Sequence, residues 1–306
     1  MTISTQLFFD QSVNQMRQQQ GRVNEIQAQV ATGKQVIKPS DAPDQAVVIA
    51  RLKSALSKQE GFDRALTSVE NRLTAEDNAL VGLQNALIRM KELTTQGAND
   101  TYGPQDRMAI ALELQGLMDH VVSLANSQDV SGNYVFAGSR VQTKPYTVED
   151  GAMVYQGDDT VSSVYISEQL QLEVNRPGSD LFGPVDRSTE PGDGAKREFF
   201  AALGDLVDAM GESDYDGIHQ GLADLVDMTD QVSLALAKVG TEMTIAESRR
   251  EMMNELVTRY KSLLSEAEDL DYSKAVTELS AEMLTLEAAQ SSFAKISSKT
   301  LFDYIR

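Results

Sequence analysis

The chain has 306 residues, of which 41% are hydrophobic and 24% charged, and its net charge is −19. This length and this hydrophobic content suffice for a core and for two or more domains, which excludes a disordered tail. The negative charge disfavours partners with a phosphate backbone and anionic membranes, so we expect no nucleic-acid binding. Neither cysteine nor tryptophan occurs, which excludes a disulfide framework, a zinc–thiolate site and a thiol nucleophile.

The acidic residues are unevenly placed along the chain. Residues 1–40 carry four Lys and Arg against two Asp and Glu, and residues 272–306 carry four of each, so the middle holds the whole excess. We therefore expect both ends to be buried against other protein. No basic segment followed by an apolar one opens the chain, and no stretch reaches about 18 apolar residues. We expect neither a cleaved secretion signal nor membrane insertion.

Residues 1–40 predict an N-terminal assembly helix. Apolar residues recur there at heptad spacing, but Gln20 and Gln27 fall on the same seam and weaken it. Because a short helix is marginal alone in water, we expect this segment to be disordered in the monomer. The residues predicted to pack during assembly are Val13, Met16, Val23, Ile26 and Val30.

Residues 41–130 predict the N-terminal half of a helical rod. A strict three-four apolar repeat begins near Val48 and stops near Gly97, after a start at which Asp41 can cap the helix and Pro43 lies in its first turn. A second seam follows Pro104 and ends at Asn126, which favours an antiparallel helical hairpin. A helix of about 50 residues is roughly 75 Å long, so an elongated molecule is expected. Its predicted core residues are Phe62, Leu66, Val69, Leu73, Leu80, Leu83, Leu87, Leu114, Leu117 and Val121.

Residues 131–190 predict a small β-rich insert, because the apolar period changes from 3.6 to 2. Asp150 and Gly151 form a hairpin-turn signal between two short alternating runs. The acidic pairs at 149–150 and 158–159 lack the spacing of a calcium-binding loop and are interpreted as solvated turns.

Residues 191–271 predict the C-terminal half of the rod, with a third seam that completes a three-helix bundle. Its core includes Val239, Val257 and Leu264. Glu76 and Arg250 interrupt the apolar seams, and we interpret them as an ion pair that sets the helix register. The fold class expected is mainly α: an elongated helical bundle or coiled coil built from both chain halves, with a small β-rich inserted domain.

Residues 272–306 predict a C-terminal assembly helix beyond a break at Asp271, again disordered in the monomer. Gln290 weakens its seam. We expect the two terminal helices to pair with each other only when other subunits enclose them. The residues predicted to pack are Val276, Leu279, Met283, Leu286, Phe293, Leu301 and Phe302.

Nothing in the sequence supports an enzyme. The two histidines, His120 and His219, lie in separate helical segments without a partner that spacing identifies, and no common nucleotide, hydrolase or metalloprotease motif occurs. We expect no catalytic residue, no cofactor and no metal site.

Several short runs together carry a family resemblance. They are IST (3–5), ATGKQV (31–36), PSDAP (39–43), DRMAIA (106–111), ANS (125–127), GNYVFAG (132–138), LEAAQSSF (286–293) and LFDY (301–304). With them the chain resembles the flagellin-related junction proteins of the bacterial flagellum, the hook-associated protein 3 family.

The resemblance implies a structural subunit at the hook–filament junction that links hook-associated protein 1 to flagellin. It also implies self-association in the axial structure, export by the flagellar type III system with an export chaperone, and an extracellular location in the flagellum. The alternatives are flagellin itself, which shares paired terminal helices, and a cytoplasmic coiled-coil scaffold.

Overall fold

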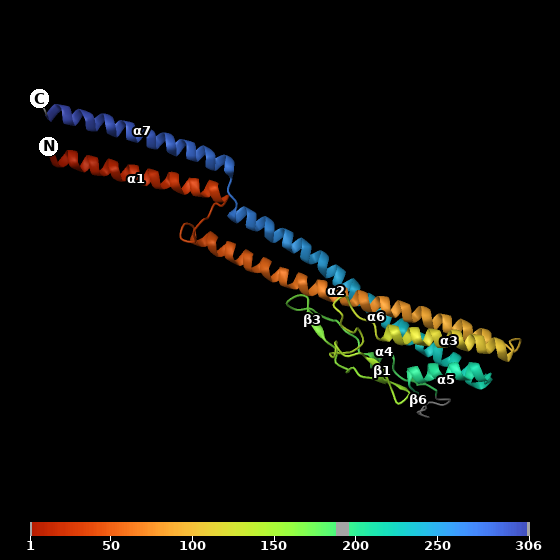
Figure 1. Ribbon diagram of the computed structural model, residues 1–306. Coiled ribbons are helices and arrows are strands. Elements are labelled where there is room, and N and C mark those ends of the chain that lie inside the picture. The colour runs from red at the N-terminus through yellow and green to blue at the C-terminus, as the bar shows by residue number, and fades with distance from the viewer. Residues whose placement is uncertain (1, 188–195, 305–306) are drawn as a thin grey trace. The chain divides into compact units, whose positions relative to one another are not determined.

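The computed structural model describes residues 2–187 and 196–304, with side chains over 7–187 and 196–296 (Figure 1). The predicted mainly-α fold with a small β-containing region is confirmed, since 71% of the chain is helical. The helices are α1 (Thr2–Thr32), α2 (Pro43–Gly97), α3 (Pro104–Ala125), α4 (Gly178–Leu181), α5 (Phe199–Glu212), α6 (Tyr215–Glu268) and α7 (Tyr272–Tyr304). The strands are β1 (Tyr146–Glu149), β2 (Ala152–Tyr155), β3 (Ser163–Tyr165), β4 (Gln171–Glu173), β5 (Val185–Asp186) and β6 (Lys196–Arg197).

The chain forms two compact units. The terminal unit comprises Met1–Gln59 and Asn254–Arg306, and the central unit comprises Glu60–Met253. Helices α2 and α6 each contribute to both units, because each continues unbroken from one unit into the other. The boundaries predicted from the sequence were at 40 and 272 instead, in the loops where glycine, proline and aspartate interrupt the helical pattern.

The core of the central unit follows the three-four repeat of α2. Helix α3 runs antiparallel to α2: a Cβ on Gly82 would lie 3.1 Å from Leu124 of α3, and one on Gly97 would lie 3.7 Å from Ile110. The side chain of Gln84 donates a hydrogen bond to Ser233 of α6 at 3.2 Å. Of the predicted core of both chain halves, Phe62, Leu117, Val257 and Leu264 are half-buried. The buried ones are Leu66, Val69, Leu73, Leu80, Leu83, Leu87, Leu114, Val121 and Val239.

Glu76 and Arg250 do not pair with each other, so that interpretation was wrong. Arg176, which lies between β4 and α4, donates to Glu76 at 2.9 Å. Arg250 donates to Glu70 at 2.6 Å and lies 3.2 Å from Asp63. Heptad position alone identifies a polar interruption in a seam but not its partner, because the partner of Glu76 lies outside the helices.

A buried arginine holds the loop between α2 and α3. Arg107 is 3% exposed and donates to the backbone carbonyls of Gly97 at 2.8 Å and Asn99 at 3.2 Å. It also donates to the Tyr215 hydroxyl at 2.7 Å, and its guanidinium lies 4.4 Å from the centre of that ring. Arg107 thus neutralises the carbonyl end of α2 and connects it to the first turn of α6.

The β-rich segment contains three separate two-stranded antiparallel sheets within the described residues, pairing β1 with β2, β3 with β4 and β5 with β6. The predicted turn joins β1 to β2, and both of its residues, Asp150 (φ 50°) and Gly151 (φ 80°), have the positive φ of a tight hairpin. β6 begins at Lys196, beyond the expected limit at 190.

Aromatic rings join the β-rich segment to α5. Tyr146 of β1 lies with its ring centre 4.9 Å from that of Phe200, and Phe182 lies 5.2 Å from Phe199 and 5.8 Å from Phe136. Such contacts add to the large apolar area that each ring buries. They anchor the strands to the helices of the central unit.

Candidate assembly site

Helices α1 and α7 lie side by side and antiparallel within the terminal unit (Figure 1). Phe9, near the start of α1, meets Phe293, near the end of α7, with ring centres 5.3 Å apart and the planes nearly perpendicular. At the opposite end, Lys34 and Asp269 form a β-bridge just past α1 and just before α7. Within one chain, the two helices therefore pair from the contact between Phe9 and Phe293 to the bridge between Lys34 and Asp269.

One face of α1 packs on α7. Every third or fourth residue there is buried or half-buried, the spacing of a coiled-coil seam. Val23 is the most enclosed, at 3% exposure. All five residues predicted for this helix are buried or half-buried, whereas Gln20 and Gln27 are exposed. The packed face consists of Phe9, Ser12, Met16, Gln19, Val23, Ile26 and Val30.

The packed face of α7 differs from the predicted one. Leu279, Leu286 and Phe293 are half-buried as part of it, but Val276 is 49% exposed and Met283 is 50% exposed. The side chains of Leu301 and Phe302 lie outside the described ones. Small and polar residues occupy the remaining seam positions, so a search for apolar periodicity does not identify them. The packed face is Ala275, Leu279, Glu282, Leu286, Ala289 and Phe293.

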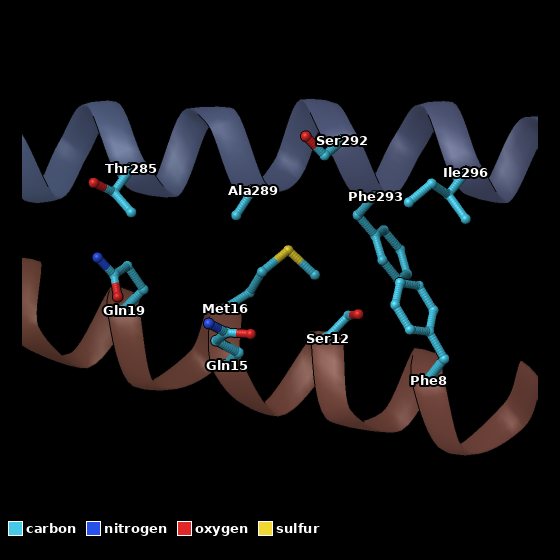
Figure 2. Close-up of a pocket in the computed structure, with 10 residues that line it drawn as sticks. All are labelled: Phe8, Ser12, Gln15, Met16, Gln19, Thr285, Ala289, Ser292, Phe293 and Ile296. Carbon is cyan, nitrogen blue, oxygen red and sulfur yellow. The ribbon is translucent and has the colours of Figure 1, made fainter. Parts of the chain in front are cut away.

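The pair is loosely packed near its free ends. Figure 2 shows Phe8 and Phe293 extending toward each other from opposite helices, with Met16 reaching into the space beside them. Ser12, Ala289 and Ser292 are too small to fill the rest. A groove of about 260 Å³ remains, so this contact lacks the close packing of a protein interior.

Polar contacts lie in the middle of the seam. The Gln19 amide donates to the carboxylate of Glu282, and Arg22 lies 3.7 Å from the same carboxylate. A polar group at a seam position disfavours shifted registers, in which it would lack its partner. Glu282 therefore fixes the register of α1 against α7 at a cost in stability.

A cluster around Glu268 closes the base of the pair. Its carboxylate lies 2.6 Å from the Lys34 ammonium and 2.8 Å from that of Lys53, and its backbone carbonyl accepts from the amide of Gln35 at 2.8 Å. The Leu270 amide donates to the carbonyl of Gly33, whose φ of 69° suits the turn that ends α1. The segment that follows α1 and the segment that precedes α7 are thus hydrogen-bonded to each other.

Asp41 does not cap α2 as predicted. Its carboxylate accepts from the Lys38 amide at 3.1 Å, which closes a turn within the loop before the helix. Asp271 caps α7 instead, accepting from the Lys274 amide at 3.1 Å.

The cluster around Glu268 is expected to weaken in acid. Hydrogen bonds from Lys34 and Lys53 lower the pKa of Glu268 below its usual 4.5, so the stabilisation is present above that value and is lost as the pH falls through the lowered pKa. We expect the amides of Gln35 and Leu270 to lose protection from hydrogen exchange several-fold between pH 7 and pH 3. In Glu268→Gln their protection should already be low at pH 7 and independent of pH. Equal wild-type protection at both pH values would contradict this.

The histidines and the acidic turns of the β-rich segment lie outside the α1–α7 pair. Both histidines have exposed side chains. The carboxylate of Asp158 accepts from the Ser139 backbone amide at 2.7 Å, and its bonds to Ser139 lower the pKa of Asp158 to about 2. Ser179 donates to Asp159 at 2.6 Å. These acidic turns thus hold loop segments together.

Residues 3–141 match the family model of the bacterial flagellin N-terminal helical region. Flagellar hook-associated protein 3 of Escherichia coli K12 is 24% identical over 315 residues, covering 99% of each chain. The chain is similar to flagellar hook-associated protein 3 over nearly its whole length. The same-named protein of Salmonella typhimurium LT2 is 23% identical over 320 residues, covering 100% of each chain.

The structural likeness agrees. The flagellar junction protein FlgL of Legionella pneumophila is 15% identical and matches 72% of this chain and 99% of its own with a TM-score of 0.61, which shows a shared fold. The resemblance found in the sequence is confirmed. The named relatives are flagellar hook-associated and junction proteins, and the similarity supports a flagellar structural role for this chain.

Proposed function

We propose that this chain is the adaptor subunit of the hook–filament junction, linking hook-associated protein 1 to flagellin. Its full-length similarity to proteins named flagellar hook-associated protein 3 supports this role. The observation that carries it is the antiparallel α1–α7 pair, which brings both chain ends into one unit with an incompletely packed seam.

The mechanism is the burial of apolar surface that one chain leaves exposed. Beyond the packed seam, α7 exposes Val276, Met283 and Leu284, the last to 68%, and α1 exposes Leu7 and Phe8. Burying such surface against neighbouring subunits contributes about 25 cal/mol per Å² of apolar area. The same gain offsets the entropy of ordering two helices that are marginal alone.

In this proposal the free chain keeps α1 and α7 mobile beyond the cluster around Glu268, and neighbouring subunits order them. Such a chain suits export through the flagellar type III channel with an export chaperone, followed by assembly outside the cell. The near-neutral ends then face other subunits, while the acidic central part keeps the chain soluble.

Electron microscopy of a strain that lacks this chain tests the proposal. We expect intact hooks without filaments, together with unpolymerised flagellin in the medium. Expression of the wild-type chain should restore filaments. Normal filaments in the deletion strain would overturn the proposed role.

Flagellin itself is the second candidate, because the match to the flagellin N-terminal region is compatible with a filament subunit. Purified chain that polymerises alone into long filaments would favour it. A cytoplasmic scaffold would instead be indicated by chain found only in the cytoplasm and absent from sheared flagella.

A further inference from the structure

The outward face of α3 exposes an apolar stripe in the central unit. Leu112 is 70% exposed and Met108 is 51% exposed. By length and composition alone, α3 is also apolar enough to cross a membrane. Ala109 and Gly116 are exposed beside them. The buried residues of α3 lie on its other side, toward α2 and α5. The face continues at steps of three or four residues through Gln105, Met108, Leu112, Gly116, Asp119 and Ser123, with Ala109 beside Met108.

Packing within the chain does not account for this stripe. Apart from its chain neighbours and the backbone of its own helix turn, no atom of the described residues lies within 4 Å of a Cβ built on Gly116. Glycine inside a helix costs about 1 kcal/mol relative to alanine, so its place on an open face is unfavourable for the isolated chain. An absent side chain does allow another backbone to approach closely.

The stripe is also nearly uncharged. Asp119 is its one ionised residue, on a chain whose net charge is −19. The neighbouring Glu113 points toward α2, where Arg89 binds it at 2.8 Å. A basic partner would gain most from the acidic surfaces, whereas a second, equally acidic copy approaches with least repulsion along an uncharged stripe.

We propose that this face of α3 docks on a second copy of the chain in the assembled structure; this rests on the proposed function. One helix face offers at most a few hundred Å², below the roughly 800 Å² per partner of a stable interface. Copies already held together by their terminal helices have an effective concentration in the millimolar range, at which so small a contact forms. The contact is therefore a consequence of assembly and is absent from dilute solution.

The test uses the absence of cysteine from the chain. Leu112→Cys places one thiol in the stripe, and Val148→Cys places a matched control on β1, where Val148 is 68% exposed. Each full-length variant is treated with a water-soluble maleimide, once as free chain and once in flagella sheared from cells. Mass spectrometry measures the labelled fraction over time.

We expect both thiols to react at similar rates in the free chain, and the thiol at 112 to react at least about tenfold more slowly in flagella, because burial blocks the thiolate. Equal rates at 112 in free and assembled chain, or equal slowing at 148, would overturn the inference while leaving the proposed function intact. Protection of 112 in the free chain by phosphatidylcholine vesicles would indicate a lipid surface and also overturn it. If the chain is absent from flagella that carry filaments, the proposed function fails, and this inference fails with it.

Discussion

Replacing Arg176 by methionine is expected to lower the free energy of unfolding of the central unit by about 3–5 kcal/mol, the cost of leaving a buried charge without its partner. The side chain of Glu76 is 2% exposed, and that of Arg176 is 13% exposed. Burial raises the pKa of the Glu76 carboxyl, and the hydrogen bond from Arg176 opposes that rise. Urea denaturation followed by circular dichroism measures the loss.

The pH dependence of this loss separates the charge from simple packing. Because the pKa of Glu76 is raised in the folded chain, folding favours its protonated form, and this stabilisation is lost as the pH rises through the raised pKa. Removing Arg176 raises that pKa further. The difference in the free energy of unfolding between Arg176→Met and wild type should therefore be largest near pH 7 and smaller near pH 5.

Two further variants control for other effects of the substitution. In Arg176→Met/Glu76→Leu both charges are gone, and the loss should largely disappear, because an apolar pair often replaces a buried ion pair at little cost. Arg197→Met removes an exposed pair with Asp205, in which Arg197 is 46% exposed, and should cost no more than about 1 kcal/mol. A loss that persists undiminished in the double variant would show that Arg176 acts through packing alone.

The long helices were predictable because local signals mark them. The repeat that begins at Val48 continues as one helix to Gly97, and Pro104 and Asn126 mark the limits of α3, with Asn126 as its cap residue. Glycine and proline act through the backbone conformation of their own residue, so their effect on helix ends and turns can be predicted from a single sequence. The turn at Asp150 and Gly151 was found for the same reason.

Contacts between distant segments were not predictable. Lys53 and Glu268 belong to different helices and are 215 positions apart, and Arg176 reaches Glu76 from outside any regular element. Periodicity reports which face of a helix is apolar but not which charged group will lie opposite. On α7 even the predicted packed face differs from the observed one, because Ala275 and Ala289 contribute little apolar signal and Glu282 contributes none. Only the geometry of α1 reveals that these positions pack.

Replacing Val23 by aspartate is expected to abolish motility and filament formation while leaving the free chain unchanged. Val23 is 3% exposed in the α1–α7 seam, where a buried carboxylate would lose its hydration, and the carboxylate of Glu287 is among the groups that line the adjacent groove. If neighbouring subunits order the terminal helices, the cost falls on assembly. Circular dichroism and urea denaturation of the purified variant should then match wild type.

Asn24→Asp is the matched control, since it adds the same charge one residue away on the exposed side of α1 and keeps an acceptor for the Gln20 amide. It should assemble and support swimming normally. Immunoblots of the medium and of sheared flagella separate export from assembly: Val23→Asp should be exported yet missing from flagella. Filaments of normal length with Val23→Asp would refute the role of the seam, and a large loss of helix in the purified variant would show that the α1–α7 pair is already stable in the free chain.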